Sequence, residues 1–207
     1  MKTILCFGDS NTYGYVPRTG ERFERQIRWT NRLNSLLGSD YDVISEGMNG
    51  RTTAFSSGID SYCCGLDYIV PCLISHSPMD LLIIMLGTND TKDRFNVNAQ
   101  EIGVGLEKLL QAAISYFHFS ARQSQILLVA PVPLGDISES CYFSKSSREK
   151  SLLLKNVYSE LAERYGCHFF DAGSVVHSLG CDGIHFTPDA HRELADGLFP
   201  VVKEILC

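Results

Sequence analysis

A serine near one end of the chain and an aspartate–histidine pair near the other have the residue types of a nucleophilic catalyst. Ser10 follows a short apolar run, and Asp182 stands three residues before His185. A serine hydroxyl attacks a carbonyl carbon at neutral pH when a neighbouring base takes its proton, and histidine is the usual base. We therefore expect Ser10 as nucleophile and His185 as the base that later protonates the leaving alcohol. Asp182 would accept a hydrogen bond from the second ring nitrogen of His185 and fix its tautomer.

Acyl transfer also needs hydrogen-bond donors for the oxyanion that develops at the attacked carbonyl. We expect the backbone N–H groups of Ser10 and Gly50 and the side-chain amide of Asn89 to supply them. Gly50 allows a close approach of the backbone, and Asn89 is a neutral donor that does not pair with the base. Gly47 remains the alternative to Gly50, because both glycines follow the same expected strand.

Other functions fit these residues less well. A phosphate-binding loop would need a glycine-rich run ending in Gly-Lys-Ser/Thr, and none follows Ser10. An α/β-hydrolase nucleophile elbow needs glycine where Thr12 stands. His185 is preferred as the base because no other histidine has an aspartate three residues before it. We interpret Asp9 and Asp90 as carboxylates that support the site through hydrogen bonds to loop backbone.

Five β-rich runs are expected to position the polar residues. They cover residues 3–7, 41–45, 81–86, 125–130 and 168–170. Helix-like segments lie between them, and strands that alternate with helices predict a doubly wound α/β fold with a parallel sheet. In such sheets ligands bind beyond the carboxyl ends of the strands. Ser10, Gly50 and Asn89 each follow an expected strand, so the topology should gather them at one edge.

Apolar residues at helical spacing predict the helices. The first stripe ends at Gly38, and Ser146 with Glu149 is expected to form a capping box before another helix. The last helix should follow Thr187 as N-cap, with Pro188 at its first position. Residues 13–25, 49–60 and 132–144 are expected to be loops that build the site. The stripes consist of Trp29, Leu33, Leu36 and Leu37, of Ile102, Leu106, Leu109, Leu110 and Ala113, and of Leu153, Leu154, Val157, Tyr158, Leu161 and Ala162.

The sequence resembles the SGNH hydrolases of the GDSL esterase family. That family has Gly-Asp-Ser near the N-terminus, a glycine after the second strand, Gly-x-Asn-Asp after the third and Asp-x-x-His near the C-terminus. All four occur here in order, as GDS at 8–10, NGRT at 49–52, GTND at 87–90 and DGIH at 182–185. The stretches EGMNGRTT, IIMLGTNDTK and FFDAGSVV further resemble the arylesterase-like, acyltransfer-capable branch. One departure is Asn11, which replaces the common leucine and which we interpret as affecting the name of the motif more than the chemistry.

The resemblance implies a single domain over residues 1–207 with a three-layer, flavodoxin-like fold around a five-stranded parallel sheet. It implies a serine esterase that hydrolyses small acyl esters such as acetates and can transfer the acyl group to other acceptors. We expect no metal or organic cofactor, because the predicted catalytic groups cover the charges that develop. We also expect a small-molecule ester as partner and self-association into a homo-oligomer.

Composition and charge argue against several classes of function. The chain of 207 residues has a formal net charge of −6 and no block of Lys or Arg, which argues against nucleic acid or an anionic membrane as partner. No apolar stretch has the length of a secretory signal or a membrane span, so we expect a cytoplasmic protein. Its eight cysteines are then reduced, and their spacing does not predict a zinc site.

Three alternatives remain open at this stage. Within the family, the enzyme would be a carbohydrate O-deacetylase, a thioesterase or a lysophospholipase, and the loops at 13–25 and 132–144 would set its specificity. Outside the family, the chain would be a phosphate-binding flavodoxin-like domain or a phosphomonoesterase. The third alternative is a non-catalytic module that binds an ester or a glycan.

Overall fold

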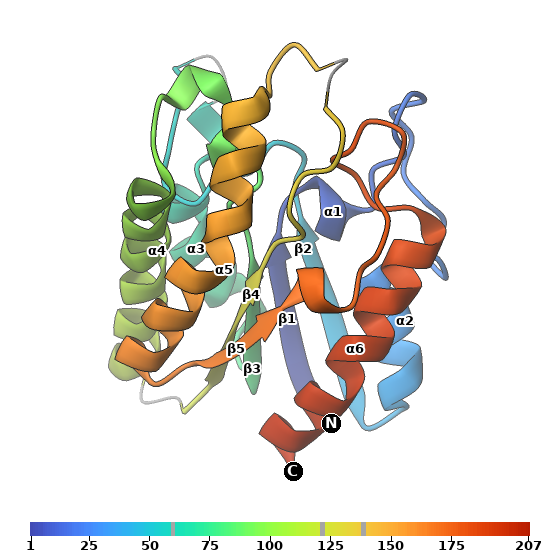
Figure 1. Ribbon diagram of the computed structural model, residues 1–207. Coiled ribbons are helices and arrows are strands. Elements are labelled where there is room, and N and C mark those ends of the chain that lie inside the picture. The colour runs from blue at the N-terminus through green and yellow to red at the C-terminus, as the bar shows by residue number, and fades with distance from the viewer. Residues whose placement is uncertain (59–60, 121–122, 138–139) are drawn as a thin grey trace.

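The computed structural model describes residues 1–58, 61–120, 123–137 and 140–207 (Figure 1). These residues form a five-stranded sheet in the order β2-β1-β3-β4-β5, and every neighbouring pair is parallel. The five predicted strands are confirmed, and their bounds differ by two residues at most. They are β1 Lys2–Gly8, β2 Tyr41–Gly47, β3 Leu81–Met85, β4 Gln125–Ala130 and β5 His168–Asp171.

Helices cover both faces of the sheet, which confirms the doubly wound three-layer fold. Figure 1 shows α3, α4 and α5 on one face and α2 and α6 on the other. Successive side chains of β3 alternate between two cores: Leu82 and Ile84 pack with α3, α4 and α5, and Leu81 and Ile83 pack with α2 and α6. This double burial explains why the strand is apolar at every position. The helices are α2 Trp29–Leu37, α3 Gly65–His76, α4 Ala99–Phe119, α5 Lys145–Tyr165 and α6 Pro188–Leu206.

The start of α6 is as predicted, and the start of α5 is not. Thr187 caps α6 by accepting the N–H of Ala190 at 3.1 Å, and Pro188 follows it. The prediction of a capping box at Ser146 and Glu149 is wrong, because α5 begins after Ser144. The backbone N–H of Ser144 donates to Ser147 Oγ at 3.1 Å. Ser147 is buried there and bonded to a carbonyl beyond β3, so it holds the helix start in place.

Two further corrections concern the helices. Leu36 and Leu153, which were expected in apolar stripes, are exposed at the surface. Helix α3 was not predicted at all, because Pro71 interrupts its pattern. Helices tolerate such a proline only with the loss of a backbone hydrogen bond, so it is usually a sign against a helix.

Parallel pairing places the carboxyl ends of all strands at one edge of the sheet, as expected. The short helix α1 (Ser10–Tyr13) follows β1 there, and the 3₁₀ helix η2 (Asn89–Thr91) follows β3. Figure 1 shows α1 at the end of the molecule opposite the two termini. Of the predicted loops, residues 59, 60, 138 and 139 lie outside the described part of the chain.

None of the helices in the described part of the chain combines the length and the hydrophobicity that a membrane span requires.

Candidate active site

Ser10, His185 and Asp182 form a continuous chain of hydrogen bonds. His185 Nε2 lies 3.0 Å from Ser10 Oγ, although 175 positions separate the two residues. On the other side of the ring, His185 Nδ1 lies 2.6 Å from Asp182 Oδ2. Ser10 is the first residue of α1, and the other two lie in the turn before α6. The structure therefore brings the three sequence-predicted residues together with the connectivity that proton transfer from the serine requires.

The turn that carries His185 is organised by the carboxylate of Asp182. Its Oδ1 accepts the backbone N–H groups of Ile184 and His185, both at 3.0 Å. Burial raises the pKa of Asp182, but the hydrogen bonds from His185 and from these N–H groups outweigh burial and lower it to about 2. Gly183 is required in the turn, because its φ is +66° and a Cβ would lie 2.0 Å from Asp136 O. At neutral pH Asp182 is therefore a negative charge held next to Nδ1 of the imidazole.

Two of the predicted loops contact this turn. The ring of Tyr15, from the loop after α1, lies 4.4 Å from the imidazole of His185 between centroids. From the second loop, the Gly135 N–H donates to Gly183 O at 2.8 Å. Segments 13–25 and 132–137 therefore border the Ser10–His185 pair, as the sequence analysis expected of loops that build a site.

The structure separates the roles of the two glycines after β2. A Cβ on Gly47 would lie 2.1 Å from the backbone nitrogen of Tyr13, so this glycine permits contact between β2 and α1. Gly50 has a φ of +81° in the turn that the Arg51 N–H closes on Met48 O at 3.1 Å. Among the described residues, the Gly50 N–H has no hydrogen-bond acceptor. An unused N–H in a left-handed turn favours Gly50 over Gly47 as an oxyanion donor.

Asn89 lies at the same edge of the sheet, at the start of η2. Its side chain is 5% exposed, and its Nδ2 donates to Arg51 O at 3.1 Å. The other hydrogen of Nδ2 makes only a long contact of 3.4 Å with Asp9 Oδ2. This second hydrogen can therefore be redirected to a stronger acceptor, because a bond of that length is weak.

Comparison with known proteins identifies the family of the chain. The model of the GDSL-like lipase/acylhydrolase family matches residues 6–193. The chain belongs to this family. Family membership makes it a carboxylic ester hydrolase and accounts for the four sequence blocks.

Solved structures of related acylhydrolases match the fold over the whole chain. The native aryl esterase of M. smegmatis is 39% identical with a TM-score of 0.92, covering 99% of this chain and 100% of that chain. A carbohydrate acetylesterase from Sinorhizobium meliloti is 33% identical with a TM-score of 0.93 over the same shares. A putative arylesterase from Agrobacterium tumefaciens is 35% identical with a TM-score of 0.89, again over 99% and 100%. Comparison with curated proteins finds no match.

Arg51 is a part of this acylhydrolase site that the sequence analysis missed. Its guanidinium is buried and donates to Gly8 O at 2.9 Å and to Glu46 O. It also stacks on the ring of Phe7, with 4.2 Å between Cζ and the ring centroid. The arginine thus ties the ends of β1 and β2 together while its own carbonyl holds Asn89. A basic residue next to Gly50 was the available signal, but the sequence alone does not show that its side chain turns inward.

Asp9 and Asp90 accept hydrogen bonds from loop backbone, as predicted. Asp9 Oδ1 accepts the Asn11 N–H at 2.9 Å, and Asp90 Oδ1 accepts the Thr53 N–H at 2.9 Å and its hydroxyl at 2.5 Å. Burial raises the pKa of both carboxyl groups to about 6, although these donors lower it. The two groups therefore support the loops around the site and are close to titration at neutral pH.

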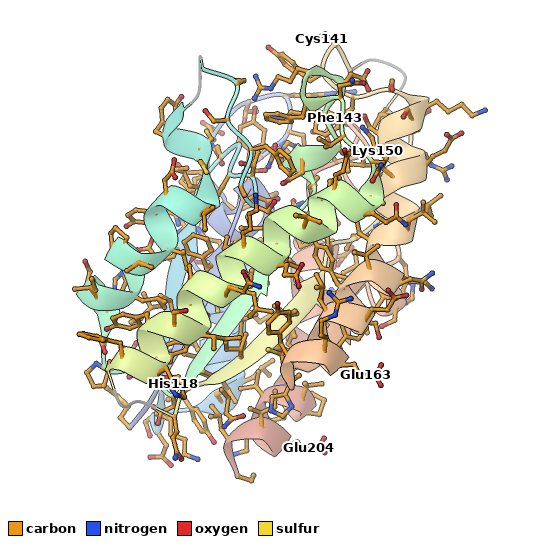
Figure 2. All side chains as sticks on the ribbon, turned by 90° about the vertical axis from the view of Figure 1, so that its left-hand side faces the viewer. His118, Cys141, Phe143, Lys150, Glu163 and Glu204 are labelled. Atoms are coloured by element: carbon orange, nitrogen blue, oxygen red, sulfur yellow. The ribbon has the colours of Figure 1, made fainter. Side chains whose placement is uncertain are left out.

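The other histidines lie in settings unlike that of His185. His191 is fully buried in the core, and burial lowers its pKa to about 3. Figure 2 shows His118 at the end of α4 that lies away from Cys141 and Phe143, which follow β4. His76 Nε2 lies 2.8 Å from the carboxylate oxygen Oε1 of Glu46, which accepts its hydrogen bond.

One group of described residues has the types of metal ligands. The ligand atoms of Glu46, Cys72 and His76 lie within 4.8 Å of one another. Burial raises the pKa of Cys72 to about 12, so its thiol is protonated. The positive charge of Arg51 acts on both Glu46 and Cys72 and disfavours a second cation there. We therefore assign no metal to this acylhydrolase on the basis of that group.

Proposed function

We propose that the enzyme is a serine esterase that hydrolyses small acyl esters, such as acetates, through an acyl-enzyme on Ser10. The observation that carries the proposal is the hydrogen-bonded chain from Ser10 through His185 to Asp182. The aryl esterase and carbohydrate acetylesterase relatives support a small acyl group with an aryl or sugar alcohol.

In the proposed reaction, Ser10 Oγ attacks the ester carbonyl while its proton passes to His185 Nε2. Asp182, which stays ionised, stabilises the imidazolium and holds its orientation. The imidazolium then gives the proton to the oxygen of the leaving alcohol, and the acyl group remains on Ser10 Oγ. Water loses a proton to His185, attacks the acyl-enzyme and releases the acid while Ser10 is reprotonated. An alcohol in place of water yields acyl transfer.

The negative charge on the attacked carbonyl oxygen is assigned to three donors. They are the N–H groups of Ser10 and Gly50 and the Nδ2–H of Asn89 that now makes the 3.4 Å contact. In the transition state this hydrogen exchanges a long contact with Asp9 for a short bond to a developing oxyanion. Such donors stabilise the transition state more than the ground state and therefore raise kcat.

Hydrolysis of p-nitrophenyl acetate by wild type and Ser10→Ala tests the proposal. We expect turnover to disappear in Ser10→Ala, with an unchanged circular dichroism spectrum and Tm. Because the exposed thiol of Cys181 adjoins Asp182 and can itself attack an activated ester, both proteins are also assayed after thiol blocking and as Cys181→Ser. Equal steady-state rates in wild type and Ser10→Ala would refute the nucleophile and favour the phosphate-binding or non-catalytic alternatives.

A carbohydrate O-deacetylase is the second candidate function. The Sinorhizobium meliloti relative, similar over 99% of this chain, is the observation that favours it. The kcat/KM values for acetylated xylosides and for aryl acetates distinguish the two candidates, and butyryl, octanoyl and acyl-CoA esters define the acyl limit. A preference for acyl-CoA or long acyl chains would instead indicate a thioesterase or a lysophospholipase.

A further inference from the structure

We propose that Asn11, the residue next to the nucleophile, positions the base by holding His185 at its distance from Ser10. The inference rests on the proposed function, since it assumes that Ser10 is the nucleophile and His185 its base. It also goes beyond the interpretation of Asn11 as a departure that affects the name of the motif more than the chemistry.

The side chain of Asn11 binds the backbone on both sides of His185. Its Oδ1 accepts the N–H of Phe186 at 3.0 Å, and its Nδ2 donates to the carbonyl of Ile184 at 3.2 Å. Asn11 is 6% exposed, so these bonds form in a protected setting where unpaired groups are costly. The two contacts fix the peptide groups that flank His185 and thereby fix the position of its Cα.

The other supports of His185 define its distance from Ser10 less directly. Asp182 holds the ring and the near side of the turn, and Tyr15 packs against the imidazole. Asp182 belongs to the turn and would move with it. Tyr15 is tied to α1 by the bond from its N–H to Ser10 O at 3.0 Å, but it meets His185 through a ring contact, which is less directional than a hydrogen bond. Apart from the bond made by Ser10 itself, Asn11 supplies the side-chain hydrogen bonds that join this turn to α1 among the described residues.

Asn11 is well placed to set this distance because it belongs to the same rigid element as the nucleophile. Its own N–H donates to Asp9 Oδ1 at 2.9 Å, which fixes the start of α1. The close approach of Gly47 to the backbone of Tyr13 holds the other end of α1 against β2. The nucleophile Ser10 and the positioning residue Asn11 are therefore consecutive residues of one element. Few freely rotating bonds then lie between this element and His185, so the separation of Ser10 and His185 varies little.

Leucine, the common family residue at this position, could form neither contact. It would leave the N–H of Phe186 and the carbonyl of Ile184 without their Asn11 partners in a buried setting, which is unfavourable. The turn that carries His185 therefore requires a side chain at position 11 that both donates and accepts a hydrogen bond, as asparagine does.

The test compares Asn11→Ala and Asn11→Asp with the matched control Asn34→Ala. Asn34 Oδ1 also accepts a backbone N–H from another element, that of Val43 at 2.9 Å, but away from the turn that carries His185. We expect Asn11→Ala to lower kcat for p-nitrophenyl acetate by about 10–10²-fold with KM nearly unchanged, because misplaced groups slow the chemical step. Asn34→Ala should lower Tm and leave kcat unchanged.

Asn11→Asp keeps the acceptor for Phe186, so it should fold even where the alanine variant does not. Its added carboxylate lies next to the turn and stabilises the imidazolium, so the acid limb of its pH profile should move to higher pH. A wild-type kcat in both Asn11 variants, or an equal loss of kcat in Asn34→Ala, would overturn the positioning role. If the proposed function itself is wrong, the result is a different one, namely full activity in Ser10→Ala.

Discussion

At the scale of single residues, the site gives chemically equal carboxyl groups different pKa values. Asp182 receives backbone N–H groups and the imidazole, so its pKa falls to about 2. Asp9 and Asp90 lie deeper, and burial raises their pKa to about 6. The ionised group thus lies beside His185, where a positive charge develops, while the supporting groups retain a proton more readily.

Removal of the Asn89 amide tests the oxyanion assignment. Asn89→Ala should lower kcat by about 10²–10³-fold, the usual effect of one lost donor, with little change in KM. Asn89→Asp places an acceptor where the donor stood, so its kcat should fall further. Steady-state kinetics with p-nitrophenyl acetate measures both, and thermal denaturation checks that the contact with Arg51 O is not needed for folding. A rise in KM at constant kcat would show that Asn89 binds substrate without stabilising the transition state.

At the scale of elements, the site depends on how closely α1 and the turn after β2 approach one another. Gly47 is needed because a side chain there would collide with the backbone of α1, whereas Gly50 is needed because its backbone has a positive φ. A methyl group at Gly47 meets backbone atoms, which cannot move aside as a flexible side chain can. One at Gly50 meets Cys63 Sγ at 3.3 Å and strains a left-handed φ.

Alanine substitutions of these glycines should therefore separate stability from catalysis. Gly47→Ala should cost about 1–3 kcal/mol of unfolding free energy through overpacking. Gly50→Ala should lower kcat, because relief of strain rotates its N–H away from the oxyanion. Gly166→Ala is the matched control, with a φ of +63° and no atom near its Cβ, and should cost stability alone. Urea denaturation and kcat are measured on all three. A lowered kcat in a stable Gly47→Ala, with normal kcat in Gly50→Ala, would assign the donor to Gly47.

The sequence predicted those parts of the fold and site whose signal is local. Strands buried on both faces are continuous apolar runs, so β3 and β4 were located to within one residue. Helix α3 was missed because Pro71 and its neighbours mask its periodicity, and the start of α5 depends on a contact with the loop after β3. The roles of Asn11 and Arg51 depend on partners 173 and 43 positions away, so no local pattern reveals them.

At the scale of the whole molecule, buried carboxyl groups link folding to pH. The ordinary aspartate pKa is 3.8, whereas Asp9 and Asp90 titrate at about 6 in the folded chain. Between these values the native state binds more protons than the unfolded state, so the free energy of unfolding falls as pH rises through this window. Asp182 acts in the opposite sense, since its contribution is present above pH 3.8 and is lost as pH falls towards 2. The two effects occupy different pH ranges and can be measured separately.

Asp90→Asn isolates the first effect. The variant keeps an acceptor for Thr53 and carries no ionisable group, so it should gain stability relative to wild type as pH rises from about 4 to about 6. Each unit of pKa shift corresponds to about 1.4 kcal/mol, which predicts a relative gain of about 2–3 kcal/mol across the window and no further change above it. Urea unfolding at half-unit intervals from pH 4 to pH 7.5 measures the difference, with the exposed Asp42→Asn as control for the loss of one carboxylate. Parallel curves for wild type and Asp90→Asn would show that Asp90 ionises in the folded protein as easily as in the unfolded chain. The support of the Thr53 loop would then rest on a permanent buried charge that the two bonds from Thr53 stabilise, and not on a carboxyl group that releases its proton near neutral pH.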